Sequence, residues 1–190
     1  MQQPRPATGM TRLAVFAYGS LVSRDSFRQT LGRPPGELVP QRLEGWRRRW
    51  STLRDNLTAE KTFARHPNGE LPRWVVGLNL ERTEPASPAP APNGALIEVT
   101  DGELQRLDVR ELRYDRIDVS EAFNERSGFD SVFAYTARAG HFAARPPAEA
   151  VRMAPYLRVL EGAFTALGEG EWELFLQTTE DHPGETIEPQ

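Results

Sequence analysis

Segments that favour β-strands outnumber helical segments along this chain, and the two types alternate irregularly. Six segments carry the apolar or alternating pattern of strands, whereas three carry the periodicity of helices. A doubly wound parallel sheet would need a regular strand–helix rhythm, which this chain lacks. The pattern therefore predicts an α+β domain whose sheet is curled or closed. We expect strands over 13–18, 44–52, 74–80, 94–99, 115–120 and 131–136, and helices over 24–31, 101–111 and 155–167.

The length of the chain fits one domain. Its 190 residues suffice for a single buried core. We expect a disordered N-terminus over residues 1–11, the domain over 12–177 and a polar tail over 178–190. The segment 84–93 is too rich in proline for a helix or a strand and indicates an extended surface loop. If the chain were an interaction module, this loop would be the part that recruits a partner.

Composition excludes several classes of protein and site. No apolar run approaches the roughly 20 residues that cross a bilayer, and the first residues lack an apolar signal region. We therefore expect a cytoplasmic protein with no membrane partner. Because the chain has no cysteine, disulfides, thiolate metal sites and cysteine nucleophiles are excluded. Three widely spaced histidines, His66, His141 and His182, form no local metal motif, so we expect no bound metal.

The segment Gly45–Trp50 mixes arginine with tryptophan, a combination that also occurs where proteins bind single-stranded nucleic acid. In a strand, however, successive side chains point to opposite faces. The arginines of this segment would then be divided between the two faces. A net charge of −4 also argues against nucleic acid, so we expect no nucleic-acid partner.

Glu111 falls where an apolar residue would be expected. Thr100 and Glu103 can form a capping box that opens a helix. At about 100° per residue, Glu111 then lies close to Leu104 in the apolar stripe. A carboxylate in that stripe, near a helix C-terminus, should hold its proton unusually tightly. Glu111 is therefore a candidate acid or base, the alternative being a structural carboxylate paired with an arginine. Arg106, Arg110 and Arg113 are expected on the opposite, solvent-facing side.

A glycine turn follows the first strand. The apolar strand 13–18 stops at Gly19, and Ser23 can cap the helix 24–31, which Gly32 would end. Such a junction of strand, turn and helix start can direct backbone N–H groups at a carboxylate or an oxyanion. Glycine turns after strands are also common in purely structural roles. Ser20 is not expected to be a hydrolase nucleophile, because no Gly-x-Ser-x-Gly motif surrounds it.

Three segments in this order resemble the gamma-glutamylcyclotransferase-like family, over roughly residues 12–140. The first is Tyr18-Gly19-Ser20-Leu21, which is similar to the substrate loop of that family. The second runs from Asn93 to Thr100 and on to Leu107-Asp108-Val109-Arg110-Glu111, where the family has its catalytic glutamate. The third is the strand around Tyr135, which in the family contributes an aromatic residue to the pocket.

The resemblance implies a small, mostly antiparallel closed β-barrel with flanking helices. It also implies a gamma-glutamyl cyclotransferase, which releases 5-oxoproline when the α-amine of a γ-glutamyl group attacks the γ-amide. The partner would be a small γ-glutamyl compound, with no metal or cofactor. Glu111 would be the general acid and base, whereas Tyr18, Gly19, Ser20, Leu21 and Tyr135 would bind the substrate.

Several alternatives stay open at this level. The amides of the 19–21 turn could stabilise the oxyanion or bind the α-carboxylate of the substrate. We expect Asp108 to bond backbone groups or an arginine rather than act as a second catalytic carboxylate. Tyr135 could be plain core, and we expect Tyr114 to be a packing residue. A non-catalytic module that binds a small carboxylated ligand in the same cavity is the main alternative function. The sequence fixes neither the leaving group nor the oligomeric state.

Overall fold

The computed structural model describes residues 11–58, 66, 68–86, 88–123 and 127–188. The expected disordered segment 1–11 lies almost wholly outside these residues. All nine elements expected from the sequence are present, and their ends lie within three residues of the expected positions. The fold is α+β, as the pattern of strands and helices predicts.

The larger sheet has five strands in the order β2-β5-β1-β7-β6. β1 is central because it pairs antiparallel with β5 and parallel with β7, and all its residues are buried. The other two pairings in this sheet are antiparallel. The strands are β1 (Leu13–Ala17), β2 (Val39–Arg42), β5 (Asn93–Val99), β6 (Tyr114–Asp118) and β7 (Ser131–Ala137).

A second sheet consists mainly of a long antiparallel ladder between β3 (Trp46–Asp55) and β4 (Trp74–Arg82). The short strand β9 (Thr179–Glu180) pairs parallel with β3. A separate two-stranded sheet joins β8 (Arg152–Met153) to β10 (Thr186–Ile187).

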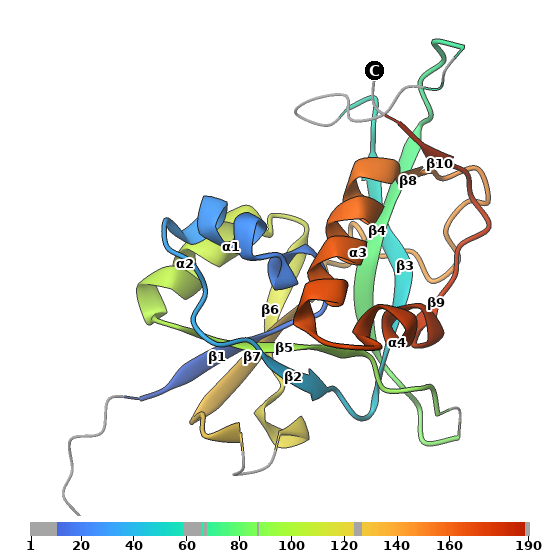
Figure 1. The fold of residues 1–190 in the computed structure, drawn as a ribbon. Coiled ribbons are helices and arrows are strands. Elements are labelled where there is room, and N and C mark those ends of the chain that lie inside the picture. Colours follow the sequence, from blue (N-terminus) through green and yellow to red (C-terminus); the bar gives the residue numbers. More distant parts are fainter. Residues whose placement is uncertain (1–10, 59–65, 67, 87, 124–126, 189–190) are drawn as a thin grey trace, which may run out of the picture.

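The helices lie in two pairs (Figure 1). α1 (Arg24–Leu31) and α2 (Asp101–Arg110) lie together beside the five-stranded sheet, whereas α3 (Ala154–Leu167) and α4 (Glu171–Gln177) lie beside the β3–β4 ladder. Two 3₁₀ turns complete the described elements: η1 (Ser20–Val22) follows β1, and η2 (Ser120–Ala122) follows β6. η1 contacts both α1 and α3, so the end of β1 lies between the two helical pairs.

The expectation of a closed barrel is wrong, because no sheet closes on itself within the described residues. β4 and β7 approach each other, but a side chain joins them instead of a backbone ladder. Asn79 Oδ1 on β4 accepts a hydrogen bond of 2.8 Å from the backbone amide of Ala137 on β7. Such a single side-chain bridge leaves the two sheets distinct.

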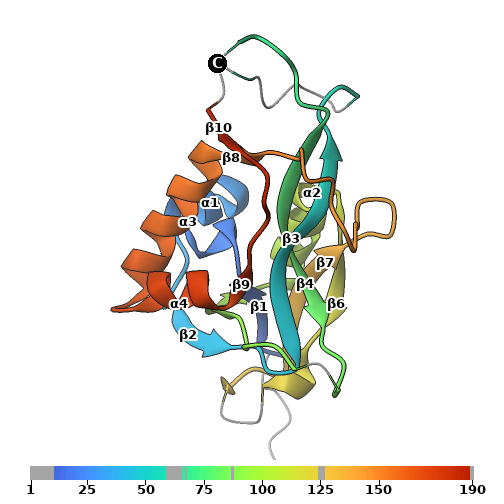
Figure 2. The same cartoon turned by 90° about the vertical axis from the view of Figure 1, so that its right-hand side faces the viewer.

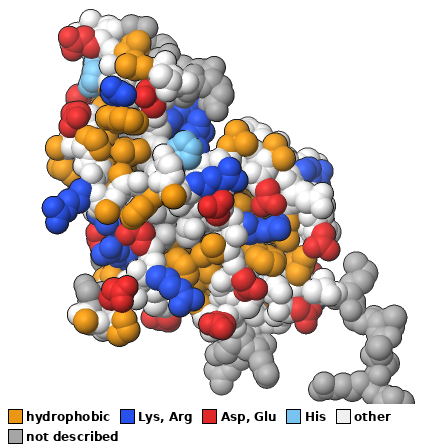
Figure 3. Space-filling view, turned by 180° about the vertical axis from the view of Figure 1, so that it is seen from behind, with side chains coloured by type: hydrophobic (Ala, Val, Ile, Leu, Met, Phe, Trp, Pro, Cys, Tyr) orange, Lys and Arg blue, Asp and Glu red, His pale blue; other side chains and the backbone are white. Residues whose placement is uncertain are grey.

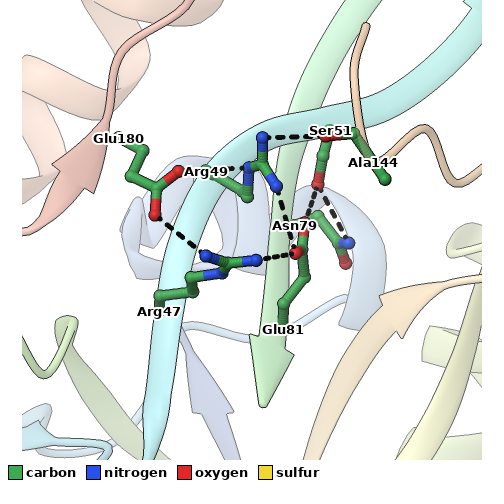
Figure 4. A network of polar contacts seen from close by, with 7 residues as sticks. All are labelled: Arg47, Arg49, Ser51, Asn79, Glu81, Ala144 and Glu180. Carbon is green, nitrogen blue, oxygen red and sulfur yellow. Dashed lines mark hydrogen bonds and ion pairs between the residues drawn. The ribbon is translucent and has the colours of Figure 1, made fainter. Parts of the chain in front are cut away.

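β3 divides its arginines between two faces, as period-2 alternation predicts. Trp46, Arg48 and Trp50 are buried on one face. On the other, Arg47 and Arg49 each form an ion pair with Glu81 and another with Glu180, as Figure 4 shows. In the same network, Ser51 Oγ donates a 2.6 Å hydrogen bond to Glu81, and Asn79 Nδ2 donates to Ser51 Oγ. The network ties β3, β4 and β9 together.

Arg48 is fully buried and forms the polar centre of the core. Its guanidinium donates to the carbonyl oxygens of Tyr18 and Asn93 at 3.2 and 2.7 Å, and to Asn93 Oδ1 at 2.8 Å. It also donates to the Phe175 carbonyl and to the hydroxyls of Thr178 and Thr179, and it stacks over the Phe175 ring. This cation therefore links β3 to the end of β1, to β5 and to α4.

Residues 178–188 belong to the folded body, although the sequence suggested a polar tail over 178–190. They run along the β3–β4 ladder from β9 to β10 (Figure 2). Thr178, His182 and Ile187 are buried, and the imidazole of His182 makes a 2.8 Å hydrogen bond with the Ala150 carbonyl. The sequence suggested a tail because most residues of this segment are polar and only a few of them are buried.

The surface shows mixed charge. On the face seen from behind in Figure 3, basic and acidic side chains are interspersed. None of the helices in the described part of the chain combines the length and the apolar character needed to cross a membrane. Of the proline-rich segment expected to be a loop at 84–93, residues 84–86 and 88–92 belong to no helix or strand, and β5 begins at Asn93.

Candidate functional site

A small cavity of about 50 Å³ lies where β1 ends. The six residues singled out from the sequence, Tyr18, Gly19, Ser20, Leu21, Glu111 and Tyr135, all line it. Tyr114 and Tyr156 also line it, so all four tyrosines of the chain surround one space with one carboxylate. These residues come from β1, η1, α2, β6, β7 and α3, which only the tertiary fold brings together.

Glu111 is the C-cap residue of α2. Its amide donates to the Leu107 carbonyl, but its backbone (φ −87°, ψ 47°) has left the helix. Its side chain is 19% exposed. Burial raises the pKa of Glu111 above the ordinary glutamate value of 4.5, and the charge of Arg110 partly opposes this rise. A sheltered carboxyl group thus faces the cavity, as its place in the apolar stripe suggested.

Arg110 contradicts the expectation that it faces solvent. Its Nε lies 3.4 Å from Glu111 Oε1, and its Nη2 donates to the hydroxyls of Ser20 and Ser26 at 3.1 and 3.0 Å. Regular helical rotation separates neighbouring side chains by about 100°. Because α2 ends at Arg110, Glu111 no longer follows that rotation, and the long arginine side chain reaches across to η1 and α1. The alternative, that Glu111 pairs with an arginine, therefore holds in part, because one long contact joins Glu111 to Arg110.

The turn after β1 is held tightly against α3. A Cβ atom on Gly19 would lie 3.1 Å from Tyr156 Oη, which is closer than almost all real contacts of this type. The backbone amide of Ser20 hydrogen-bonds the same hydroxyl. On its other side, the Tyr18 carbonyl accepts from buried Arg48. A side chain at position 19 would therefore crowd the Tyr156 hydroxyl, and the turn is held from both sides.

Three of the tyrosine hydroxyls donate to fixed acceptors. Tyr18 Oη donates to the Tyr135 carbonyl at 2.7 Å, and Tyr114 Oη donates to the Leu78 carbonyl at 2.8 Å. Tyr135 Oη donates to Asp108 Oδ1 at 2.8 Å. Burial raises the pKa of each of these phenols, so they stay neutral at ordinary pH. They act as a rigid, uncharged wall.

Asp108 lies outside the cavity lining. Besides Tyr135, it contacts Arg116, with 3.3 Å between Nη1 and Oδ2. Asp108 thus pairs with an arginine, as expected from the sequence. Glu111 is thus the carboxylate that the fold brings to this cavity.

A larger groove of about 550 Å³ opens beside the cavity. The two share Ser20, Glu111, Tyr114 and Tyr156, so Glu111 is reached from both spaces. The groove is lined further by side chains of β3, β4, α2, the α2–β6 connection and the start of α3. A volume of this size is typical of small-molecule sites, which span about 300–1,000 Å³.

Sequence reasoning missed Tyr156 and Arg110, and it treated Tyr114 as packing alone. Tyr156 follows Pro155 in the first turn of α3, where the local pattern indicates an ordinary helix start. Its contact with the Gly19–Ser20 turn spans 137 or so positions of sequence, which no local pattern reports. The chain has only four tyrosines, and this rarity is a signal in the sequence that could have drawn attention to Tyr156.

Metal ligands are not grouped in the described part of the chain. Among these residues, no set of three or more histidine, cysteine, aspartate or glutamate side chains could hold a metal ion. His182 bonds the Ala150 carbonyl, and His66 lies 3.6 Å from Glu185.

No protein-family model matches the sequence, and a search of curated proteins also finds no match. Solved structures do match. An uncharacterized protein from Homo sapiens superimposes with a TM-score of 0.59 at 15% identity, over 93% of this chain and 94% of that chain. A structure named gamma-glutamyl cyclotransferase gives a TM-score of 0.57 at 15% identity, over 92% and 93% of the two chains. A yeast gamma-glutamyl cyclotransferase specific to glutathione gives 0.53 at 14% identity, over 90% and 98%. The chain therefore has an α+β fold similar to that of gamma-glutamyl cyclotransferases.

Proposed function

We propose that the protein is a gamma-glutamyl cyclotransferase, which releases 5-oxoproline from a γ-glutamyl compound. The observation that carries this proposal is Glu111, a sheltered carboxyl group with a raised pKa that lies at the junction of a small cavity and an open groove. The Gly19–Leu21 turn lines the same cavity. The similarity of fold supports the same activity.

The reaction needs one base and one acid. The α-amine of the γ-glutamyl group loses a proton and attacks its own γ-carbonyl carbon, which forms the ring C–N bond. The resulting tetrahedral intermediate bears an oxyanion, and its collapse breaks the original C–N bond and expels the amine. The departing nitrogen must gain a proton. A carboxylate can take the first proton and return it to the leaving nitrogen, so atoms and charge balance without another reagent.

Glu111 suits both steps because its pKa is raised. A base works best when its pKa lies near the operating pH, and burial moves this carboxyl in that direction. The charge of Arg110, 3.4 Å away, limits this rise of the pKa. Glu111 would therefore be the general base in ring closure and the general acid in amine release.

The turn after β1 would bind the part of the substrate that cyclises. The first amides of a helical turn lack acceptors within it and favour negative charge. The Ser20 amide at the start of η1 already hydrogen-bonds Tyr156 Oη, which fixes the turn, and the turn could meet the oxyanion or the α-carboxylate through its backbone amides. The tyrosine wall would hold the γ-glutamyl chain in a folded conformation and exclude water, which brings amine and carbonyl close together.

The test is turnover of a panel of γ-glutamyl compounds by the purified full chain, with 5-oxoproline measured by mass spectrometry. Glu111→Gln should lower the rate by about 10²-fold or more, because general acid–base catalysis contributes roughly that much. Glu161→Gln on the exposed face of α3 is the matched control and should leave the rate unchanged. A Glu111→Gln rate equal to the wild-type rate would refute the assignment. Binding of γ-glutamyl compounds without any turnover would instead support a binding module.

A further inference from the structure

The segment 181–188 lies directly against the backbone that precedes α3. The carbonyl oxygen of the fully buried Ala150 makes a 2.8 Å hydrogen bond with His182 Nε2. Because a carbonyl oxygen can only accept, the ring nitrogen is the donor. A Cβ atom on Gly184 would lie 1.8 Å from the same carbonyl oxygen and 2.5 Å from His182 Nε2. The two backbones therefore approach so closely at Gly184 that a side chain there would force the segment away.

The same segment pairs with β8, the short strand that leads into α3. The amide of Arg152 donates to the Glu185 carbonyl at 2.9 Å, within the parallel pairing of β8 with β10. On its other side this stretch of chain joins β4, because the amide of Val76 donates to the Val151 carbonyl at 3.0 Å. Residues 150–153 are thus held between β4 and the segment 181–188 (Figure 2).

Ile187 supports the wall of the groove. This side chain is buried and packs with Val75, Val151 and Met153 in a small hydrophobic cluster that is separate from the main core. Val75 and Met153 also line the groove beside Glu111. The segment 181–188 therefore lies behind one part of the groove wall.

The first turn of α3 carries this packing to the cavity. The N-cap residue of the helix is Met153, whose side chain has no oxygen to accept from the first amides. Three residues later, Tyr156 lines the cavity, where its hydroxyl bonds the Ser20 amide and lies close to Gly19. Because one helical turn is rigid, a shift of residues 150–153 would move Tyr156 as well.

We propose that the segment 181–188 is a positioning element of the site, with His182 and Gly184 as the residues that anchor it. By fixing the start of α3, it keeps Tyr156 against the turn after β1 and Met153 in the groove wall. Among the described residues, none from this segment lines the cavity or the groove, so it acts through α3 and does not touch the substrate. This inference rests on the proposed function, because it assigns the preorganisation of that site to a segment outside it.

Gly184→Ala tests this role, because the added Cβ must displace the segment. Hydrogen exchange should become faster at the amide of Arg152, which donates to the segment, and at the amide of Ser20, which bonds Tyr156. For a γ-glutamyl compound, kcat/KM should fall about tenfold to hundredfold, since small misplacements far from the chemistry have effects of this size. Gly36→Ala, whose Cβ would meet nothing within 4 Å, is the matched control and should change neither amide nor the rate.

The exchange of the two amides separates positioning from a general loss of stability. Faster exchange at Arg152 with wild-type exchange at Ser20, or with wild-type kcat/KM, would show that the segment moves without the site, and would overturn the inference. Unchanged exchange at Arg152 would also overturn it, because the backbone of Ala150 would then tolerate the added Cβ. If no γ-glutamyl compound is turned over, the proposed function fails, and exchange at Ser20 alone decides on the positioning role.

His182 provides a second test should Gly184→Ala not fold. His182→Gln keeps a donor near the position of Nε2, whereas His182→Leu leaves the Ala150 carbonyl without that donor. We expect His182→Leu to speed exchange at Ser20 and to lower kcat/KM, and His182→Gln to restore both towards the wild-type values. Equal exchange and equal rates in the two variants would overturn the inference.

Discussion

Replacing Arg48 by methionine tests what holds the turn after β1 in place. Methionine reproduces the apolar stem of arginine, so the change removes the charge, the donors and the packing of the guanidinium while the site stays apolar. Two carbonyl oxygens, those of Tyr18 and Asn93, lose the donor that Arg48 supplies, whereas Asn93 Oδ1 keeps a 3.5 Å hydrogen bond from the Thr178 hydroxyl. The Phe175 carbonyl keeps a second donor, the hydroxyl of Thr179.

The magnitude follows from two opposing terms. Each buried acceptor left without a partner costs about 1–3 kcal/mol, so two cost roughly 2–6 kcal/mol. Removing the cation recovers part of this, because burial disfavours the charge and lowers the pKa of Arg48. We therefore expect a loss of about 3–5 kcal/mol, the range seen when one side of a buried charged network is removed. At about 2–4 °C per kcal/mol for a chain of this size, Tm should fall by roughly 6–20 °C.

The assay is urea unfolding followed by circular dichroism, together with thermal unfolding. Arg82→Met is the matched control on the neighbouring strand, where an exposed guanidinium lies over Trp46, a contact worth about 0.5–1 kcal/mol. A free energy of unfolding for Arg48→Met within about 1 kcal/mol of the wild type would refute this reasoning. It would mean that the free-energy cost of burying the charge is as large as the stabilisation from the hydrogen bonds that Arg48 donates.

Three further predictions concern the site and its frame. Because protonated Glu111 cannot accept a proton, kcat/KM should fall on the acid side with an apparent pKa above 4.5, and Glu111→Gln should lack that limb. The raised pKa means that the folded state holds its proton more tightly, so stability is lost as pH rises through that pKa. Glu111→Gln should accordingly be more stable than the wild type at neutral pH in urea titrations, and a less stable variant would contradict this sign. Gly19→Ala should cost about 1–3 kcal/mol, because its Cβ crowds Tyr156, and it should slow turnover. Gly162→Ala in α3, where nothing lies within 4 Å, should instead stabilise by about 0.5–1 kcal/mol, and equal effects of the two changes would refute the crowding. Asn79→Ala should cost about 1–3 kcal/mol by leaving a β7 amide without its acceptor, and unchanged protection of that amide in hydrogen exchange would count against the bridge.

Local chemistry explains why so many elements could be predicted. Ser23 and Gly32 mark the two ends of α1, and the capping box of Thr100 and Glu103 opens α2, as expected from their sequence. These signals work because each depends on hydrogen bonds within a few residues. Local patterns brought Glu111 and the 18–21 turn forward separately, and the family resemblance joined them as one site; the structure places them around one cavity.

Long-range contacts explain what could not be predicted. Closure of the sheet fails because Asn79 bridges to β7 with its side chain, a choice that depends on the separation of two strands about 50 residues apart. α4 and β9 went unnoticed because one buried ring, Phe175, and one buried arginine hold them, in a polar setting. The position of Arg110 required knowing that α2 ends one residue before Glu111.

Some side chains around the cavity have their hydrogen-bond partners within the fold, and others do not. This difference indicates where a ligand would act. Tyr18, Tyr114 and Tyr135 each donate to an acceptor within the fold, so their orientations are set before any substrate arrives. Arg110 and Glu111 differ, because they share only one long contact and each retains capacity for a partner. A site built this way loses little order on binding, since only these two side chains and the ligand must adjust. The stability given up by sheltering Glu111 would then be recovered in the complex, where this carboxyl group meets the charge of the substrate.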